Sequence, residues 1–122
     1  MIMMTTIKTY RDGLVWQKAM LLVNKIYTVT TNFPDKETFV LTSQIRKCTI
    51  SIPSTIAESY GKHSFEDHLR LLNIALSSLY EFQTLIEIAL NQEYLNKQIF
   101  DLLYEDSRDI ERLLTNQIQK LD

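Results

Sequence analysis

The sequence predicts an all-α fold, an antiparallel up-down-up-down four-helix bundle. The chain has 122 residues with only two glycines and two prolines, which leaves few turns and disfavours β-sandwiches and barrels. Apolar residues recur at helical spacing in four segments, and the short connections between these segments predict antiparallel neighbours. The length predicts one domain, residues 1–122, in which residues 1–12 form an N-terminal arm that is either poorly ordered or an early contact segment.

The first helix is expected from about Leu14 to Thr31. Asp12 is a candidate N-terminal cap. Phe33-Pro34 ends the helix, because the residue before a proline avoids the helical region. The apolar positions at helical spacing are Trp16, Ala19, Met20, Val23, Ile26 and Tyr27.

The second helix is expected to start near residues 36–38 and to stop at Gly61. Its interior holds Pro53, which lacks a backbone donor and costs about 3 kcal/mol in a helix interior. We therefore expect packing to impose a kink at Pro53. Ser51 and Glu58 are the polar residues expected to hold this kink, with Glu58 as a buried or half-buried acceptor.

The third helix is expected from Ser64 to about Leu90, and the fourth from about Asn96 to Lys120. Ser64 and Asp67 resemble a capping box at the start of the third helix. The apolar surface of the third helix is wider than the stripe of about 100° that a bundle helix needs. This excess predicts either a deeply central helix or a subunit interface.

Charge is divided unevenly along the chain. Residues 1–62 carry eight Lys/Arg against four Asp/Glu, and residues 63–122 carry five against eleven. One half could attract the opposite half of a neighbouring copy, the basic half could contact RNA, or both could be ordinary solvated surfaces. The candidate nucleic-acid contacts are the loosely clustered basic residues Arg46, Lys47, Lys62 and Arg70. Phosphate binding by such residues depends on salt and is largely blind to sequence.

The sequence predicts no metal site, cofactor or catalytic centre. His63 and His68 are five residues apart and neither follows a Glu by three positions, so neither a zinc nor a di-iron pattern is formed. Gly13 and Gly61 are isolated, which argues against a phosphate-binding loop. Cys48, the only cysteine, is expected in the core and fits a reducing cytoplasm. No apolar run reaches the roughly 18 residues of a membrane span, so a cytoplasmic location is expected.

Several separated motifs, in order along the chain, resemble a known family. They are Val15-Trp16-Gln17-Lys18-Ala19, Phe33-Pro34, Leu41-Thr42-Ser43-Gln44-Ile45-Arg46, Ser51-Ile52-Pro53 and Ile56-Ala57-Glu58. With this pattern, over about residues 13–121, the chain resembles the bacterial four-helix-bundle proteins encoded by intervening sequences within 23S ribosomal RNA genes. The resemblance implies an antiparallel bundle that assembles into a homopentameric ring. That family is also similar to the pentameric accessory protein of diversity-generating retroelements, which binds reverse transcriptase and nucleic acid.

The chain departs from the family pattern at several positions. Thr55 and Ser59 stand where the family usually has Asn and Gly, and Leu76 stands where an Arg is common. The retroelement protein is strongly basic, whereas this chain has a net charge of −2. These departures weaken the expectation of nucleic-acid binding and leave the expected fold unchanged.

Two functions are therefore expected as alternatives. The first is a non-enzymatic homo-oligomeric binding or scaffold protein, pentameric as the resemblance implies, whose partner is RNA, DNA or a nucleic-acid enzyme such as a reverse transcriptase. The second is a purely structural protein-interaction module without nucleic-acid binding. In that case the acidic side of the fourth helix, with Glu105, Asp109 and Glu111, would face a protein partner.

Overall fold

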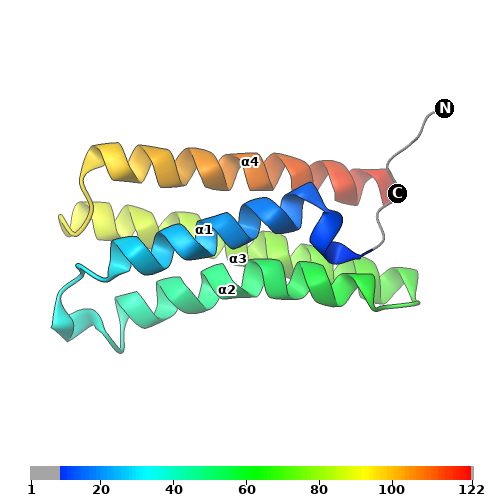
Figure 1. Cartoon of the computed structure of the whole chain (residues 1–122), viewed down its shortest axis with the longest axis horizontal. Helices are drawn as coiled ribbons and strands as arrows, with labels where there is room; N and C mark the ends of the chain where they lie inside the picture. The colour runs from blue at the N-terminus through cyan, green and yellow to red at the C-terminus, as the bar shows by residue number, and fades with distance from the viewer. Residues whose placement is uncertain (1–8, 122) are drawn as a thin grey trace.

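Four long helices carry the apolar periodicity of the sequence (Figure 1). They are α1 (Leu14–Thr30), α2 (Leu41–Tyr60), α3 (Phe65–Asn91) and α4 (Lys97–Leu121). Two short 3-10 helices, η1 (Tyr10–Asp12) and η2 (Asp35–Glu37), precede α1 and α2. These bounds come from a computed structural model, which describes residues 9–121.

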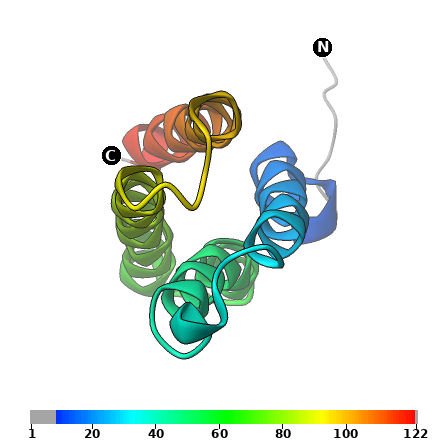
Figure 2. The same cartoon turned by 90° about the vertical axis from the view of Figure 1, so that its left-hand side faces the viewer.

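The four helices run alternately up and down and surround a common core (Figures 1 and 2). The prediction of an all-α four-helix bundle is confirmed. The contact between α2 and α3 is the most extensive, and the contact between α1 and α4 is the least extensive. The bundle is therefore closed most weakly along its α1–α4 side.

The apolar stripes of all four helices meet in one core. The largest fully buried apolar side chains are Leu22 and Ile26 of α1, Ile45, Ile52 and Ile56 of α2, Leu72, Leu79, Phe82 and Ile86 of α3, and Ile110 and Leu114 of α4. Burial of each such side chain contributes about 1.5–3 kcal/mol relative to leaving it exposed. These positions recur every three or four residues, which is why the helical periodicity of the sequence located them.

The described part of the chain begins within the expected N-terminal arm. Residues 1–8 of that arm lie outside the described residues, whereas residues 10–12 form η1, which contacts α1 and α2 as an early contact segment would. The Asp12 carboxylate accepts a hydrogen bond from the Thr9 amide (3.2 Å), which closes η1. Asp12 therefore caps η1 rather than α1, whose N-cap residue is Gly13.

The second helix begins later than predicted. Residues 36–38 belong to η2 and the turn after it, and the non-helical backbone of Val40 (φ −121°, ψ −97°) separates them from α2. The Glu37 carboxylate accepts from the amide of Leu41 (3.4 Å) and from the hydroxyl of Tyr94 (2.9 Å). Glu37 thus joins the α1–α2 connection to the α3–α4 connection, a contact that no local pattern could reveal.

The helix α2 continues through Pro53, which is buried. Around the proline, the hydroxyls of Thr49 and Thr55 donate to backbone carbonyls four residues earlier, at 2.5 and 2.7 Å. Such side-chain bonds to the preceding turn often accompany a bend in a helix. The kink at Pro53 itself stays a prediction.

The ends of α3 and α4 are set by local capping. Ser64 is the N-cap of α3, as predicted, and its hydroxyl accepts from the Asp67 amide (3.3 Å). The α3–α4 turn places Glu93 in the left-handed region (φ 65°). The side chain of Asn96 accepts an amide hydrogen bond from the first turn of α4 (2.8 Å).

Candidate interaction surfaces

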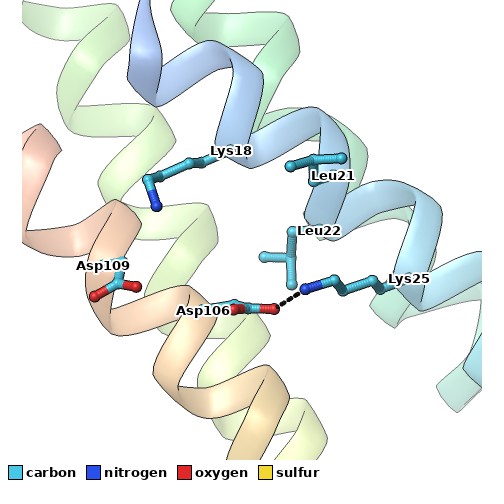
Figure 3. Close-up of a pocket in the computed structure, with 6 residues that line it drawn as sticks. All are labelled: Lys18, Leu21, Leu22, Lys25, Asp106 and Asp109. Carbon is cyan, nitrogen blue, oxygen red and sulfur yellow. Dashed lines mark hydrogen bonds and ion pairs between the residues drawn. The ribbon is translucent and has the colours of Figure 1, made fainter.

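A groove runs between α1 and α4, the two helices with the least extensive contact. Its central section has a volume of about 170 Å³ and is lined by Lys18, Leu21, Leu22, Lys25, Asp106 and Asp109 (Figure 3). An adjoining apolar section of about 400 Å³ is lined chiefly by Val29, Ile99, Leu102 and Leu103. Lys25 borders both sections, which therefore form one surface; we call it the α1–α4 groove.

The two walls of the α1–α4 groove carry opposite charge (Figure 3). Lys25 Nζ lies 2.6 Å from Asp106 Oδ2, while Lys18 extends from α1 toward α4. The side chains of Lys25 and Asp106 are 53% and 34% exposed, so their ion pair contributes only about 0.2–1 kcal/mol. The ion pair therefore adds little to the contact between α1 and α4. The α1 wall of the groove is basic and the α4 wall is acidic.

Large apolar side chains stand on both edges of the α1–α4 groove. Leu21 of α1 is 58% exposed and Leu102 of α4 is 66% exposed. Single exposed leucines are common, but two that flank one apolar groove form a patch of the kind found at interfaces. Sequence reasoning placed the surplus apolar surface on the third helix instead, because it could not show which neighbours cover each stripe. In the structure α3 packs extensively against α2 but still exposes Phe65, Ile74 and Ile88. The α1–α4 groove adds exposed apolar surface at Leu21 and Leu102, which the sequence did not single out.

The four basic candidates do not form one patch within a single chain. Lys47 and Lys62 are both exposed, but they lie about 20 Å apart along the axis of α2. Among residues 9–121, neither lysine has an acidic group within 4.0 Å. The Arg70 guanidinium lies 3.6 Å from the Asp67 carboxylate, so it already has a partial counterion.

Arg46 of α2 contacts two residues of α1. Its Nε donates to the hydroxyl of Thr30 (2.9 Å), and its guanidinium carbon lies 4.7 Å from the centre of the Tyr27 ring. A guanidinium over an aromatic face contributes about 0.5–1 kcal/mol at an exposed site. Arg46 thus links α2 to α1 and is the least available of the four basic candidates.

The acidic side of α4 is largely paired with arginines of the same helix. Arg112 lies 2.6 Å from Asp109 and 4.0 Å from Glu105, and Arg108 lies 3.3 Å from Glu111. The excess negative charge counted in the sequence is therefore reduced locally on this face. Opposite charges three residues apart on one helix are neighbours in space, which explains the pairs Asp109–Arg112 and Arg108–Glu111.

The polar residues assigned to the centre of α2 behave differently from one another. The Ser51 and Ser78 hydroxyls are hydrogen-bonded at 2.9 Å, which joins α2 to α3 where the two helices pack closely. Glu58 is exposed, so the expectation of a buried or half-buried acceptor is wrong. The reason is its position on the helix: residues 56 and 59 face the core, and Glu58 between them faces outward.

Cys48 is a core residue, as predicted. Its thiol donates to the carbonyl of Ile45 (3.3 Å), and the residue as a whole is 4% exposed. Burial, and to a lesser extent the nearby negative charge of Glu81, raises the pKa of the Cys48 thiol to about 12. Only the thiolate is nucleophilic, so this cysteine is inert in the folded chain.

Over residues 9–121 no group of three or more His, Cys, Asp or Glu side chains is placed to hold a metal ion. None of the helices in that range combines the length and the apolar character that a membrane-crossing segment needs.

Comparison with known proteins agrees with the fold and with the motif pattern. In fold the chain is similar to a protein of unknown function from the S23 ribosomal protein family of Bacteroides thetaiotaomicron, with a TM-score of 0.82 and 26% sequence identity. The similarity covers 89% of this chain and 98% of that one. No curated protein was found to match. A sequence model for the 23S rRNA-intervening sequence protein family matches residues 11–116, and the chain therefore belongs to that family.

Proposed function

We propose that this protein is a non-enzymatic homo-oligomeric scaffold whose copies associate through the α1–α4 groove. The observation that carries the proposal is the pair of exposed leucines, Leu21 and Leu102, on the two edges of this groove. Neither the family description nor the similar structure names a catalytic activity. The family resemblance implies that five copies form a ring.

The chemistry of the groove suits contact between identical copies. Covering an exposed Leu side chain contributes up to about 1.5–3 kcal/mol, so two leucines in one contact provide a useful driving force. Lys25 and Asp106 pair within one chain, but Lys18 of the α1 wall has no acidic side chain of residues 9–121 within 4.0 Å. Lys18 of one copy can therefore pair with an acidic side chain on α4 of the next copy, which orients the approach. A contact between two different walls is head-to-tail, and such contacts close into rings when the rotation permits.

Sedimentation velocity tests the proposal directly. The wild-type chain should sediment as a multiple of its 14.3 kDa mass, whereas the double variant Leu21→Glu/Leu102→Glu should sediment at 14.3 kDa. The physical reason is that two carboxylates on the edges of the groove would have to be desolvated to form the contact.

A matched control is available on the outer face of α3. Ile74 and Ile88 are 38% and 41% exposed there, away from the α1–α4 groove. The variant Ile74→Glu/Ile88→Glu should keep the wild-type mass, and helical circular dichroism should show that both double variants are folded. A wild-type particle of 14.3 kDa across the accessible concentrations would contradict the proposal.

A second candidate function, nucleic-acid binding by the assembled scaffold, is favoured by one observation. Lys47 and Lys62 are exposed and are not neutralised by acidic side chains of residues 9–121 within 4.0 Å. A ring would repeat each lysine once per copy, so separated charges would become a circular array. Such an array would bind phosphates without sequence preference.

Fluorescence anisotropy with a labelled structured RNA tests this second function. Each pair of lysine–phosphate contacts predicts an affinity loss of about tenfold between roughly 50 and 200 mM salt, and an array that uses several copies loses correspondingly more. The variant Lys47→Gln/Lys62→Gln should remove that dependence. Lys97→Gln is the control, because Lys97 is already paired with Asp101 at 2.7 Å. If the RNA does not bind at low salt, the second function is contradicted and nucleic acid is not a partner of the scaffold.

A further inference from the structure

A second groove, between α1 and α2, is separate from the one used in the proposed function. Its volume is about 320 Å³, and its lining comes chiefly from Trp16, Met20 and Val23 of α1 and Ile50, Pro53 and Ala57 of α2. Met20 and Ile50 are 36% and 39% exposed. We call this surface the α1–α2 groove; it is apolar along both walls.

The chain itself leads into one end of the α1–α2 groove. Tyr10 lines the groove, and its ring packs edge-to-face on Trp16 with 5.2 Å between ring centres. The Arg11 guanidinium lies 5.4 Å from the centre of the same indole ring. η1 contacts both α1 and α2, and the capping bonds of Thr9 fix its first turn. Residues 1–8 are therefore attached directly beside the groove.

The composition and the length of residues 1–8 suit the α1–α2 groove. The segment reads Met-Ile-Met-Met-Thr-Thr-Ile-Lys, with five apolar side chains and no acidic one. Methionine is unbranched and flexible, and it fills irregular apolar surfaces well. Eight extended residues span about 26 Å, whereas the groove from Trp16 to Val23 follows about 10 Å of helix. The segment is long enough to cover the groove even after a reversal of direction.

We propose that residues 1–7 dock in the α1–α2 groove of their own chain and cover Trp16. The tether makes this an intramolecular event, so its effective concentration greatly exceeds that of a separate peptide. Docking would bury one of the two apolar grooves beside α1. The α1–α4 groove would then be the surface left open for other molecules.

Trp16 is the only tryptophan of the chain and lines the groove, so its fluorescence reports on the proposal. A chain that starts with Met followed by Thr9 should show Trp16 emission at longer wavelength and stronger quenching by acrylamide than the full chain. The full-length variant Met3→Asp/Met4→Asp should show the same two changes. The control Thr5→Asp/Thr6→Asp places the same charges on polar positions of the segment and should resemble the wild type.

A proximity measurement makes the test independent of folding effects in the truncated chain. A nitroxide attached to Met3→Cys, in a Cys48→Ala/Leu21→Glu/Leu102→Glu background kept at 14.3 kDa, should quench Trp16 fluorescence strongly and to the same degree at every protein concentration. A nitroxide at Gln98→Cys is the control, because Gln98 is exposed in the first turn of α4, at the opposite end of the bundle from the start of α1 (Figure 1). Quenching that grows with concentration would mean docking on a second copy and would overturn the proposal. Equal Trp16 emission and quenching in the full and truncated chains would overturn it as well.

Discussion

At the scale of single residues, burial decides the chemistry of Cys48. The raised pKa of this thiol, about 12 against an ordinary 9.0, reflects the cost of placing a thiolate in the core. The three-unit difference corresponds to a thiolate fraction about a thousandfold smaller than in the unfolded chain near neutral pH. The position of Cys48 in an apolar stripe indicated from the sequence alone that this residue lies in the core.

We predict that Cys48 makes the stability of the protein fall at alkaline pH. The folded state favours the protonated thiol, so this contribution is complete below about pH 9 and is lost as the pH rises toward 12. Urea unfolding between neutral pH and about pH 10.5 should show a steeper loss for the wild type than for Cys48→Ala. Titrating tyrosines affect both chains alike, so parallel curves would contradict the prediction.

Side-chain contacts distinguish Arg46 from the other basic candidates. Arg46 could be identified as a basic residue from the sequence, but its bonds to Thr30 and Tyr27 come from another helix. Glu58 illustrates the opposite error, because a residue expected to be a buried acceptor is exposed. Both outcomes depend on the rotation of α2 relative to its neighbours.

At the scale of the helices, the contact between α2 and α3 depends on small side chains. Ser51 and Ser78 meet at 2.9 Å, and this pair of helices has the most extensive contact in the bundle. Small residues permit the close approach of two helix backbones, and a hydroxyl pair satisfies both polar groups there. The serines of α2 and α3 therefore have a packing role rather than a catalytic one.

We predict that a larger side chain at Ser78 destabilises the bundle. Ser78→Leu should lower the free energy of unfolding by about 1–3 kcal/mol through overpacking. Ser78→Ala should cost about 1 kcal/mol through the lost hydrogen bond. The neighbouring Ser77 is exposed, so Ser77→Leu should change stability by less than about 0.5 kcal/mol. Equal urea midpoints for the two leucine variants would show that α2 and α3 do not approach closely at this level.

At the scale of the whole molecule, the two grooves beside α1 divide the apolar surface of the bundle. The α1–α4 groove has charged walls and exposed leucines, whereas the α1–α2 groove is apolar and includes Tyr10 of η1 in its lining. A chain with a net charge of −2 has little overall attraction for a polyanion. Contact with other molecules is therefore expected at specific surfaces rather than through a general field.

We predict that the thermal midpoint of unfolding rises with protein concentration. Association stabilises the folded state by mass action, so a hundredfold increase in concentration should raise the midpoint by several degrees. The variant Leu21→Glu/Leu102→Glu should show a midpoint independent of concentration. Differential scanning calorimetry over two decades of concentration distinguishes the two cases, and a flat wild-type profile would contradict the prediction.

Much of the fold could be predicted because helix formation and helix burial leave local patterns. The four apolar stripes, the scarcity of glycine and proline, and the cap at Ser64 each depend on residues within a few positions of one another. The start of α2 was predicted wrongly. Glu37 accepts from the nearby Leu41 amide but also from the hydroxyl of Tyr94, which lies in a turn far away in the sequence. The candidate site was predicted less well, because exposure depends on which helix covers which stripe.

The sequence by itself determined the class of the protein: four amphipathic helices, a single core and membership of a recognisable family, all of which follow from periodicity and ordered motifs. Only the tertiary structure decided which surfaces remain open. The extent of each helix contact results from the fit of side chains more than twelve residues apart, and it leaves α1 and α4 incompletely covered while α2 and α3 pack closely. Local patterns record that a face is apolar, but they do not record what lies against it.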